Sequence, residues 1–443
     1  MASSSSWLDI DEASEFSLAN LPFGIVSRAG CWEEPRPAIA LGTYVVSLRD
    51  LAERNGFAEC PDAIPHLAVF TAGSLNNMAA IGRPFSQTLR TYIRDLLVTD
   101  TPYPHLLRDN HELRSSAIQP RKECQMHMPM EIGDYTDFYV GLNHAYNVGV
   151  LFRGPQNALQ PNYTHLPVGY HGRASTVRIS GAPVRRPRGQ ILPMPGATEP
   201  IFAASRKLDV ELELAAFVCR TNGTDGRPIP IAEAEQYIFG FVLMNDWSAR
   251  DIQAFEYVPL GPFNSKNFCT TISPWVVTVD ALEPFRCDSR IDAARTQKLL
   301  PYLDERRATG RRSFYDIRLE MVLTPAQQGN SGLRKAHVVT NTNAANLLFS
   351  FPQMLAHHSV GGCEMRVGDL LGSGTISGPD TGSMGSLLEI TENGKTPLTL
   401  GEGISRCFLE DGDEVNIKGV AGQLGAYVGF GDCSGIILAA NNE

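Results

Sequence analysis

Short apolar runs alternate with polar turns along most of the chain, a pattern that predicts strands joined by tight turns rather than a bundle of helices. The clearest alternation is KLDVELELAAF, residues 207–217. On a strand, successive side chains point to opposite faces, so its apolar residues share one face and its acids the other. The apolar face holds Leu208, Val210, Leu212 and Leu214, and the acidic face holds Asp209, Glu211 and Glu213.

A second stretch, residues 239–277, reads as two apolar strands with a helix between them. The run 239–244 has the length of a buried strand, and Asn245-Asp246 after it is suited to cap a helix. Over 247–257 the polar side chains fall on one helical stripe, and the Pro- and Gly-rich turn after it ends the helix. The stripe and the turn hold Asp246, Arg250, Gln253, Tyr257 and Lys266.

The N-terminal part of the chain mixes short strands with helices. Strands are predicted at 23–27, 38–41 and 44–48, and helices at 71–81 and 85–98. The polar, proline-containing segment 99–121 is typical of a junction between domains. We therefore predict an N-terminal domain of residues 1–125.

Residues 126–443 are predicted to form a second, β-rich domain. Its further helices are expected near 231–237 and 344–358, the latter kinked or started at Pro352. Residues 283–335 contain the basic run RTQKLLPYLDERRATGRR and are interpreted as a surface insertion, which a subunit contact or an anionic substrate would also explain.

Composition narrows the class of protein. The 443 residues are 43% hydrophobic and 19% charged, and the net charge is -10. This describes a globular enzyme or binding protein and argues against a nucleic-acid or anionic-membrane partner. Nine cysteines are scattered without a CxxC pair, which predicts reduced thiols in a cytoplasmic protein. We find no signal peptide and no apolar run of the ~18–20 residues that span a bilayer.

The acidic face of residues 207–217 has two interpretations. One is an edge strand with a wet acidic face, which discourages edge-to-edge pairing. The other is a metal site built from oxygen ligands alone, because carboxylates ~6–7 Å apart repel unless they are solvated or bridged by a cation. Such a site suits Mg²⁺ or Ca²⁺ rather than zinc.

Other candidate residues lie in three further segments. The acidic and aromatic stretch 131–154 brings Asp137, Tyr139, His144 and Arg153 close together in sequence. The glycine-rich turn 369–378 has backbone amides suited to an oxyanion. Glu389 follows on an apolar strand, SLLEI, where a lone acid is costly without a His or Arg partner. The polar stripe that starts at Asp246 is either part of the site or a solvated helix face with an i,i+4 ion pair.

These segments together resemble the fumarylacetoacetase family. The matching motifs are IGDYTDFY with His144, FRG, NYTHLPVGYHGRAS, LDVELELAAFV, FGFVLMNDWSARDIQAFEYVPLGPFNSKNF, TTISPWVV, HHSV, GDLLGSGTISG and GFGDCSG. The resemblance is specific over 126–435 and looser over 20–98. This sequence departs from the family in its Ser-rich start, its 97–125 connection and its 283–335 segment, none of which carries a site residue.

The resemblance implies a fold and a reaction. The fold is mainly β with some α: a small N-terminal SH3-like barrel and a large β-rich C-terminal domain of the fumarylacetoacetase type, in a homodimer. The reaction is metal-dependent hydrolysis of 4-fumarylacetoacetate to fumarate and acetoacetate, the last step of tyrosine and phenylalanine catabolism. The alternatives are a related acylpyruvate hydrolase or oxaloacetate decarboxylase, and a catalytically silent scaffold.

The resemblance also implies roles for individual residues. His144 is the expected general base with Glu389 as its partner, and Arg250, Gln253 and Lys266 stabilise developing negative charge. Substrate contacts are expected from Tyr139, Arg153, Gln253, Tyr257 and Thr375. The expected metal ligands are Asp137, Glu211, Glu213 and Asp246 for catalytic Ca²⁺ or Mg²⁺, with Lys266 and Thr270 beside Asp246 helping to hold a possible second, structural Mg²⁺.

Overall fold

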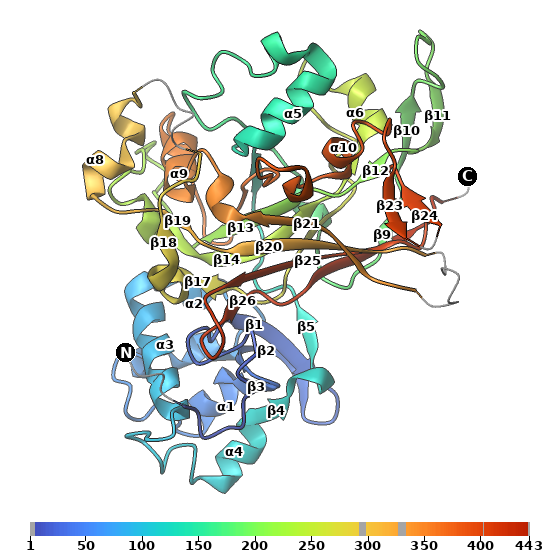
Figure 1. Cartoon of the computed structure of the whole chain (residues 1–443). Coiled ribbons are helices and arrows are strands. Elements are labelled where there is room, and N and C mark those ends of the chain that lie inside the picture. Colours follow the sequence, from blue (N-terminus) through green and yellow to red (C-terminus); the bar gives the residue numbers. More distant parts are fainter. Residues whose placement is uncertain (1–4, 292–297, 327–333, 402, 442–443) are drawn as a thin grey trace.

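The structure, a computed structural model, describes residues 5–291, 298–326, 334–401 and 403–441. Its N-terminal elements gather at one end of the molecule, against the long strands of the rest (Figure 1). They include a five-stranded antiparallel sheet in the order β4-β3-β2-β1-β5. The strands are β1 (Phe23–Arg28), β2 (Trp32–Leu41), β3 (Tyr44–Ser47), β4 (Ile118–Pro120) and β5 (Gln125–His127). The predicted boundary at 125/126 falls at β5; that boundary and the SH3-like topology stay predictions.

Helices cover this sheet on the N-terminal side of the molecule. They are α1 (Leu48–Glu53), α2 (Asn76–Ala80), α3 (Arg83–Leu97) and α4 (His111–Ala117). α3 confirms the helix predicted at 85–98, because its period buries Leu89, Ile93 and Leu96. The helix predicted at 71–81 is much shorter: a 3₁₀ helix ends at Thr71, and only α2 is α-helical.

The centre of the molecule is an eight-stranded sheet in the order β7-β6-β22-β13-β14-β16-β8, with β17 also paired to β14. Its strands β13 and β14 pair antiparallel from Leu212↔Asn245 to Val218↔Ile238. The bounds are β6 (Tyr135–Phe138), β7 (Gly169–His171), β8 (Val177–Ile179), β13 (Leu212–Val218), β14 (Ile238–Asp246), β16 (Thr270–Ile272), β17 (Val277–Thr278) and β22 (Leu370–Gly372).

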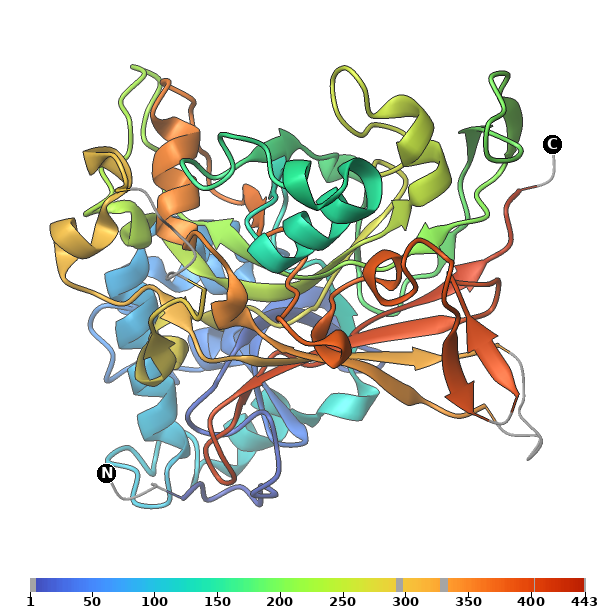
Figure 2. The same cartoon turned by 45° about the horizontal axis from the view of Figure 1, so that its top comes forward.

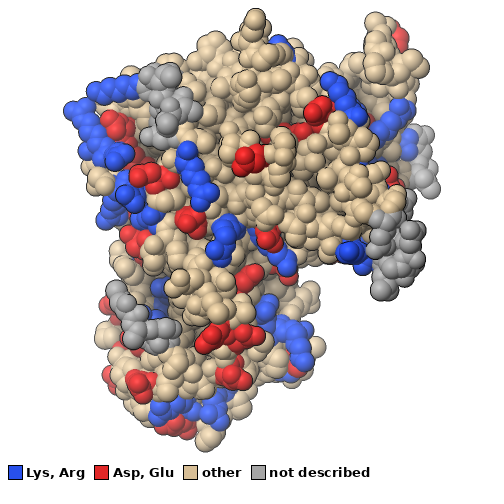
Figure 3. All heavy atoms as spheres, in the orientation of Figure 1, with Lys and Arg blue, Asp and Glu red and all other residues tan. Residues whose placement is uncertain are grey.

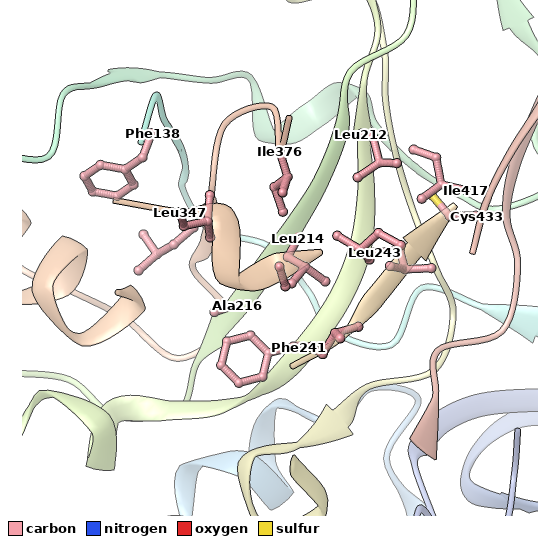
Figure 4. Close-up of a cluster of buried hydrophobic side chains, with 14 of the residues drawn as sticks. Phe138, Leu212, Leu214, Ala216, Phe241, Leu243, Leu347, Ile376, Ile417 and Cys433 are labelled. Carbon is pink, nitrogen blue, oxygen red and sulfur yellow. The ribbon is translucent and has the colours of Figure 1, made fainter. Parts of the chain in front are cut away.

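A six-stranded sheet packs on one face of the central sheet, in the order β21-β20-β25-β27-β9 with β26 on β25. Figure 4 shows Leu243 of the central sheet beside Ile417 and Cys433 of this layer, and Leu214 belongs to the same buried cluster. Its strands are β9 (Val184–Arg185), β20 (Arg318–Thr324), β21 (His337–Asn343), β25 (Glu414–Ala421), β26 (Val428–Gly429) and β27 (Cys433–Leu438).

The opposite face of the central sheet packs against the N-terminal elements. Phe217 of β13 and Phe239 of β14 lie in one buried cluster with Phe23 of β1 and Leu89 of α3. The central strands are therefore apolar on both faces, as buried sheets require. β13 has β22 and β14 as neighbours, so the interpretation of residues 207–217 as a wet edge strand is wrong.

Helices α5 (Leu142–Arg153), α6 (Arg250–Glu256) and α10 (Leu387–Ile390) lie together on the side away from the N-terminal helices (Figures 1 and 2). The remaining α-helices of the described residues are α7 (Val279–Leu282), α8 (Glu305–Thr309) and α9 (Phe351–Ser359). The described residues also form four two-stranded ribbons: β10 (Arg188–Ile191) with β11 (Ile201–Ala204), β12 (Leu208–Asp209) with β15 (Ser248–Ala249), β18 (Arg286–Cys287) with β19 (Phe314–Tyr315), and β23 (Leu398–Gly401) with β24 (Ile404–Arg406).

Several local predictions need correction. The helix expected over 247–257 begins only at Arg250, because Asp246 continues β14 instead of capping the helix. Glu389 lies on α10 and not on a strand, since Ser386 caps a short helix there. Near 231–237 only the last four residues form a helix, of 3₁₀ type. For the helix expected at 344–358, the alternative of a start at Pro352 is confirmed: α9 begins at Phe351 with Pro352 in its first turn, and residues 344–346 form a separate 3₁₀ helix.

The interpretation of residues 283–335 as a surface insertion is wrong for β20. Leu319, Met321 and Leu323 of this strand are buried in the core between β21 and β25. Residues 292–297 and 327–333 lie outside the described part of the chain. On the face drawn in Figure 3, Lys and Arg side chains are interspersed with Asp and Glu rather than gathered into one basic surface.

Among the helices of the described residues, none combines the length and apolar content that a bilayer crossing needs.

Candidate active site

Three buried carboxylates from three strands of the central sheet form a compact group. They belong to Asp137 of β6, Glu213 of β13 and Asp246 of β14, and one oxygen of each lies within 4.8 Å of the others. All three side chains share the sheet face that also carries the N-terminal packing, so the face changes from apolar to acidic along the strands. We call these three residues the carboxylate trio.

The trio fits a hard divalent cation. Oδ1 of Asp137 and Oε1 of Glu213 are buried without a hydrogen-bond donor among the described residues. A buried acceptor without a partner is costly, and oxygen-only ligand sets are those that Mg²⁺ and Ca²⁺ prefer. Gly372 of β22 makes room for the group, since a Cβ there would come within 2.5 Å of Oδ1 of Asp137.

The electrostatics of the trio point the same way. Burial, followed by the charge of Asp246, raises the pKa of Asp137 well above its ordinary value. Burial, followed by the charge of Asp137, does the same to the pKa of Glu213. Mutual repulsion between buried carboxylates is relieved either by protons or by a bound cation.

Glu211, predicted as a fourth ligand, is held differently. Its carboxylate is paired with Nζ of Lys266 and with Nη2 of Arg250, the latter at 2.8 Å. Burial alone raises the pKa of Glu211, but Lys266 and Arg250 outweigh burial and hold the pKa below its ordinary value. In this structure Glu211 therefore links the two cations Lys266 and Arg250.

Lys266 also reaches the trio directly. Its Nζ lies 2.6 Å from Oδ2 of Asp246, and Oγ1 of Thr270 lies 3.3 Å from Oδ1 of the same residue. Burial lowers the pKa of the Lys266 ammonium, but Asp246 and Glu211 outweigh burial and raise it. Lys266 and Thr270 thus lie beside Asp246, as predicted.

His144 and Glu389, which are 245 positions apart, are in contact. Nδ1 of His144 on α5 lies 2.6 Å from Oε2 of Glu389 on α10, and both side chains are buried. Nε2 of His144 faces the acidic group, 3.7 Å from Oε1 of Glu211. If Nδ1 carries the proton to Glu389, Nε2 is left as a free acceptor on the side of the trio.

Glu389 is fixed in its ionised form. Its carboxylate accepts hydrogen bonds from Asn147 Nδ2 at 2.9 Å, Ser377 Oγ at 2.9 Å and Ser386 Oγ at 2.8 Å. Burial raises the pKa of Glu389, but His144 and these hydrogen bonds together lower it. Asn147, Ser377 and Ser386 were not singled out in the sequence, since a serine or asparagine gives no signal of a partner so distant along the chain.

A cavity of about 400 Å³ joins these groups. The predicted substrate contacts Tyr139, Arg153, Gln253, Tyr257 and Thr375 all line it, together with His144, Arg250, Lys266 and two members of the trio. Oγ1 of Thr375 is buried and without a hydrogen-bond partner among the described residues. Arg153 donates to the carbonyl oxygens of Asn157 and Ala158. Of the predicted site residues, only Asp246, Thr270 and Glu389 do not line this cavity. Asp246 and Glu389 contact the lining residues Lys266 and His144, and Thr270 contacts Asp246.

Tyr170 is a further residue of the cavity that was not predicted from the sequence. Its hydroxyl donates to Oδ2 of Asp246 at 2.8 Å, and burial, followed by the charge of Asp246, raises its pKa. The motif PVGYHGR, quoted for its family resemblance, contains this residue and was the available signal.

Two family models match the chain. Fumarylacetoacetase N-terminal matches residues 19–129, and Fumarylacetoacetate (FAA) hydrolase C-terminal matches residues 135–433. Among curated proteins, the fumarylacetoacetase fahA of Aspergillus fumigatus is 57% identical over 98% of both chains. The fumarylacetoacetase of Arabidopsis thaliana is 46% identical over 99% of both chains, and that of Homo sapiens is 44% identical over 98% of this chain and 99% of the other.

A solved structure shares the fold. The fumarylacetoacetate hydrolase of the psychrophile Exiguobacterium antarcticum superposes with a TM-score of 0.51 and covers 95% of this chain and 99% of its own, at 14% identity.

The first prediction concerns Glu213→Gln. Because this change removes one charge from the trio, we expect Mg²⁺ or Ca²⁺ to stabilise the variant much less than the unaltered protein, which gains about 2.7 kcal/mol at a hundredfold excess over Kd. Thermal unfolding with and without the cation measures this stabilisation for the variant and for the unaltered protein. Glu305→Gln is the matched control, since Glu305 is a buried acid whose pKa burial raises but which lies outside the trio. An equal cation response in the Glu213→Gln protein would contradict the site.

The second prediction concerns pH. Without a cation, the folded-state pKa values of Asp137 and Glu213 lie above their unfolded values. Asp137 and Glu213 then hold protons that the unfolded chain has lost, so their contribution to stability should rise as pH falls from roughly 8 to 5. A bound cation should flatten this dependence, and cation affinity should rise with pH because protons compete for the same oxygens. Unfolding scans in EDTA and in CaCl₂ across this range test both effects; identical slopes would refute them.

Proposed function

The chain belongs to the fumarylacetoacetase family, and from that premise we propose how its residues share the work of the reaction. The enzyme is a hydrolase that cleaves a C–C bond of 4-fumarylacetoacetate to give fumarate and acetoacetate, in tyrosine catabolism. Full-length likeness to fumarylacetoacetases, at 57% identity to that of A. fumigatus, supports this activity over acylpyruvate hydrolysis or oxaloacetate decarboxylation. The observation that carries the division of roles is the His144–Glu389 pair facing the carboxylates in one cavity.

The reaction sets three requirements. Water must add to one carbonyl carbon of the β-diketone, the C–C bond must then break, and the departing enolate carbon must receive a proton. Water is a weak nucleophile and a carbon anion is a poor leaving group, so a base and stabilising positive charge are both required.

His144 is the proposed base. Glu389 holds Nδ1 at 2.6 Å and so orients the ring. Nε2 faces the cavity and takes the proton of the attacking water. Once protonated, the same ring has a proton to return to the enolate carbon, which balances the reaction. Glu389 remains ionised because its carboxylate is held by His144, Asn147 and two serine hydroxyls.

The trio and Glu211 are the proposed ligand set for a divalent cation, which we assign as Ca²⁺ or Mg²⁺ because all their donor atoms are oxygens. When bound, the cation supplies Lewis-acid polarisation of the diketone oxygens. A second, structural Mg²⁺ beside Asp246, Lys266 and Thr270 is part of the same proposal.

Arg250, Gln253 and Lys266 are the proposed donors to negative charge that develops during the reaction. Burial lowers the pKa of Arg250, but Glu211 and Asp209 outweigh burial and raise it, so the guanidinium remains charged. Nη1 of Arg250 donates to Oε1 of Gln253 at 3.1 Å, which leaves the Gln253 amide group free to donate elsewhere. Removing one such donor typically costs about 3–4 kcal/mol of transition-state stabilisation.

Substrate contacts are proposed for Tyr139, Arg153, Gln253, Tyr257 and Thr375, which line the cavity. Arg153, which lines the cavity, is suited to pair with a carboxylate of the dianionic substrate. The ring of Tyr139 meets that of His144 edge-on, with centroids 5.5 Å apart, and packs the base in place.

We further propose a homodimer in the cytoplasm. The nine cysteines are all free thiols, in keeping with a reducing compartment. Sedimentation of the purified protein measures its oligomeric state.

The third prediction tests the function itself. The purified protein should remove the diketone absorbance of fumarylacetoacetate, EDTA should stop the reaction, and Mg²⁺ or Ca²⁺ should restore it. Acylpyruvates and oxaloacetate serve as comparison substrates under the same conditions. Turnover of either with none of fumarylacetoacetate would overturn the assignment.

The fourth prediction concerns His144→Ala. Loss of the base should lower kcat by about 10²- to 10⁴-fold, while Ca²⁺ binding measured by calorimetry stays within error because no ligand is changed. His127→Ala is the control, since its ring contacts Ser27 in the N-terminal sheet. An unchanged kcat in the His144→Ala protein would remove His144 as the base.

A further inference from the structure

Asp209 is a buried acid close to the cavity with no role in the scheme above. It ends β12 and its side chain is 0% exposed. Asp209 precedes Glu211 and Glu213 in the same alternating stretch, but it lies on β12, in a different sheet from Glu213 on β13, and does not belong to the carboxylate trio.

Four N–H donors converge on the Asp209 carboxylate. Oδ2 accepts from Nε of Arg250 at 2.8 Å and from the backbone N–H of Leu388 at 3.0 Å. Oδ1 accepts from the backbone N–H groups of Leu387 and Val210, both at 2.8 Å. An ionised carboxylate is the side-chain group that offers only acceptors, about four lone pairs on two oxygens, so this set is fully matched.

Three of these donors come from two elements that carry opposite halves of the site, and the fourth is the backbone N–H of the next residue, Val210. Arg250 opens α6, and its Nη2 lies 2.8 Å from Oε1 of Glu211. Leu387 and Leu388 form the first turn of α10, which holds Glu389 one residue later. Glu389 in turn holds Nδ1 of His144. Asp209 therefore contacts Arg250 directly, and it is linked to His144 through Leu388 and Glu389.

We propose that Asp209 is a positioning residue that fixes Arg250 relative to α10, so that the base and the charge-stabilising guanidinium keep one relative geometry. This rests on the roles given above to Arg250 and His144. A displacement of about 1 Å at a reacting group is enough to cost about 100-fold in rate. The carboxylate is the common anchor that prevents such a displacement.

Asp209→Asn tests the proposal with little change in shape. An amide keeps one acceptor oxygen but turns an NH₂ group toward N–H donors, so at least one of the two elements loses its anchor. We expect kcat to fall by about 10- to 100-fold and KM to stay within about threefold, because substrate-binding residues are unaltered. A raised KM at unchanged kcat would overturn the proposal.

Asp413→Asn is the matched control. Asp413 is also 0% exposed, accepts from Nε and Nη2 of Arg406 at 2.8 and 3.0 Å, and accepts from the backbone N–H groups of Glu410 and Ala326. None of these residues lines the site cavity. The two variants should lose comparable thermal stability, but the Asp413→Asn protein should keep its kcat within about twofold. Equal losses of kcat would show that Asp209 is merely structural.

Two measurements test separately the contact of Asp209 with Arg250 and its contact with α10. In a double-mutant cycle, Asp209→Asn should cost at least about fivefold less in kcat when Arg250→Met is already present. Hydrogen–deuterium exchange of the α10 peptide should increase in Asp209→Asn and not in Asp413→Asn. Additive losses of kcat would rule out the role of the contact with Arg250. Unchanged hydrogen exchange of the α10 peptide would rule out the role of the contact with α10.

Asp209→Glu covers the case in which the asparagine variant does not fold. It keeps the charge and the acceptors but moves the carboxylate, and the same fall in kcat at constant KM is expected. Turnover by the unaltered protein in the same assay distinguishes the two levels of the proposal. No turnover there refutes the proposed function, whereas normal turnover with an unaffected Asp209→Glu protein refutes only the role of Asp209.

Discussion

Burial of negative charge on one face of the central sheet is the constraint on which the rest of the site depends. Asp137, Glu213 and Asp246 are each at most 2% exposed, and an unpaired buried carboxylate costs several kcal/mol. The structure offsets this cost with positive groups: Lys266 contacts Asp246, and Arg250 pairs with Glu211. The unpartnered oxygens of Asp137 and Glu213 are what remains for a metal ion to satisfy. A pocket charged in this way is suited to hold a dianion and a cation together.

The layered architecture explains why such a site persists. Six-stranded and eight-stranded sheets share one core, and the N-terminal elements cover the other face of the eight-stranded sheet. β13 and β14 are therefore held on both faces, and the acids at their ends cannot relax toward solvent. The helices that carry Glu389 and Arg250 are short, so their placement depends on side-chain contacts such as those of Glu389 and Asp209.

The local features of this site could be predicted from the sequence, whereas contacts between segments distant in the chain could not. Strict alternation over 207–217 correctly separated the apolar residues from Asp209, Glu211 and Glu213, because side-chain alternation is a local property. The stretch nevertheless forms two strands, β12 and β13, rather than one. It could not tell a wet edge from a buried centre, which depends on β22 and β14 arriving from elsewhere in the chain. Pairing of His144 with Glu389 was accessible only through family resemblance. The helical stripe that began at Asp246 failed because β14 extends by hydrogen bonds to β16 through Asp246 itself, a tertiary effect that no helical period contains.

The hydrophobic cluster between the central sheet and the N-terminal elements also bears on whether the chain can be cut into two stable parts. Phe217, Phe239 and Val242 reach their buried state only when Phe23, Leu89 and their neighbours cover them. Without the first hundred or so residues, the larger part would expose a broad hydrophobic surface along its longest strands. Exposed hydrophobic surfaces of this kind promote aggregation. None of the described residues of the small N-terminal part lines the cavity, but that part covers this hydrophobic surface.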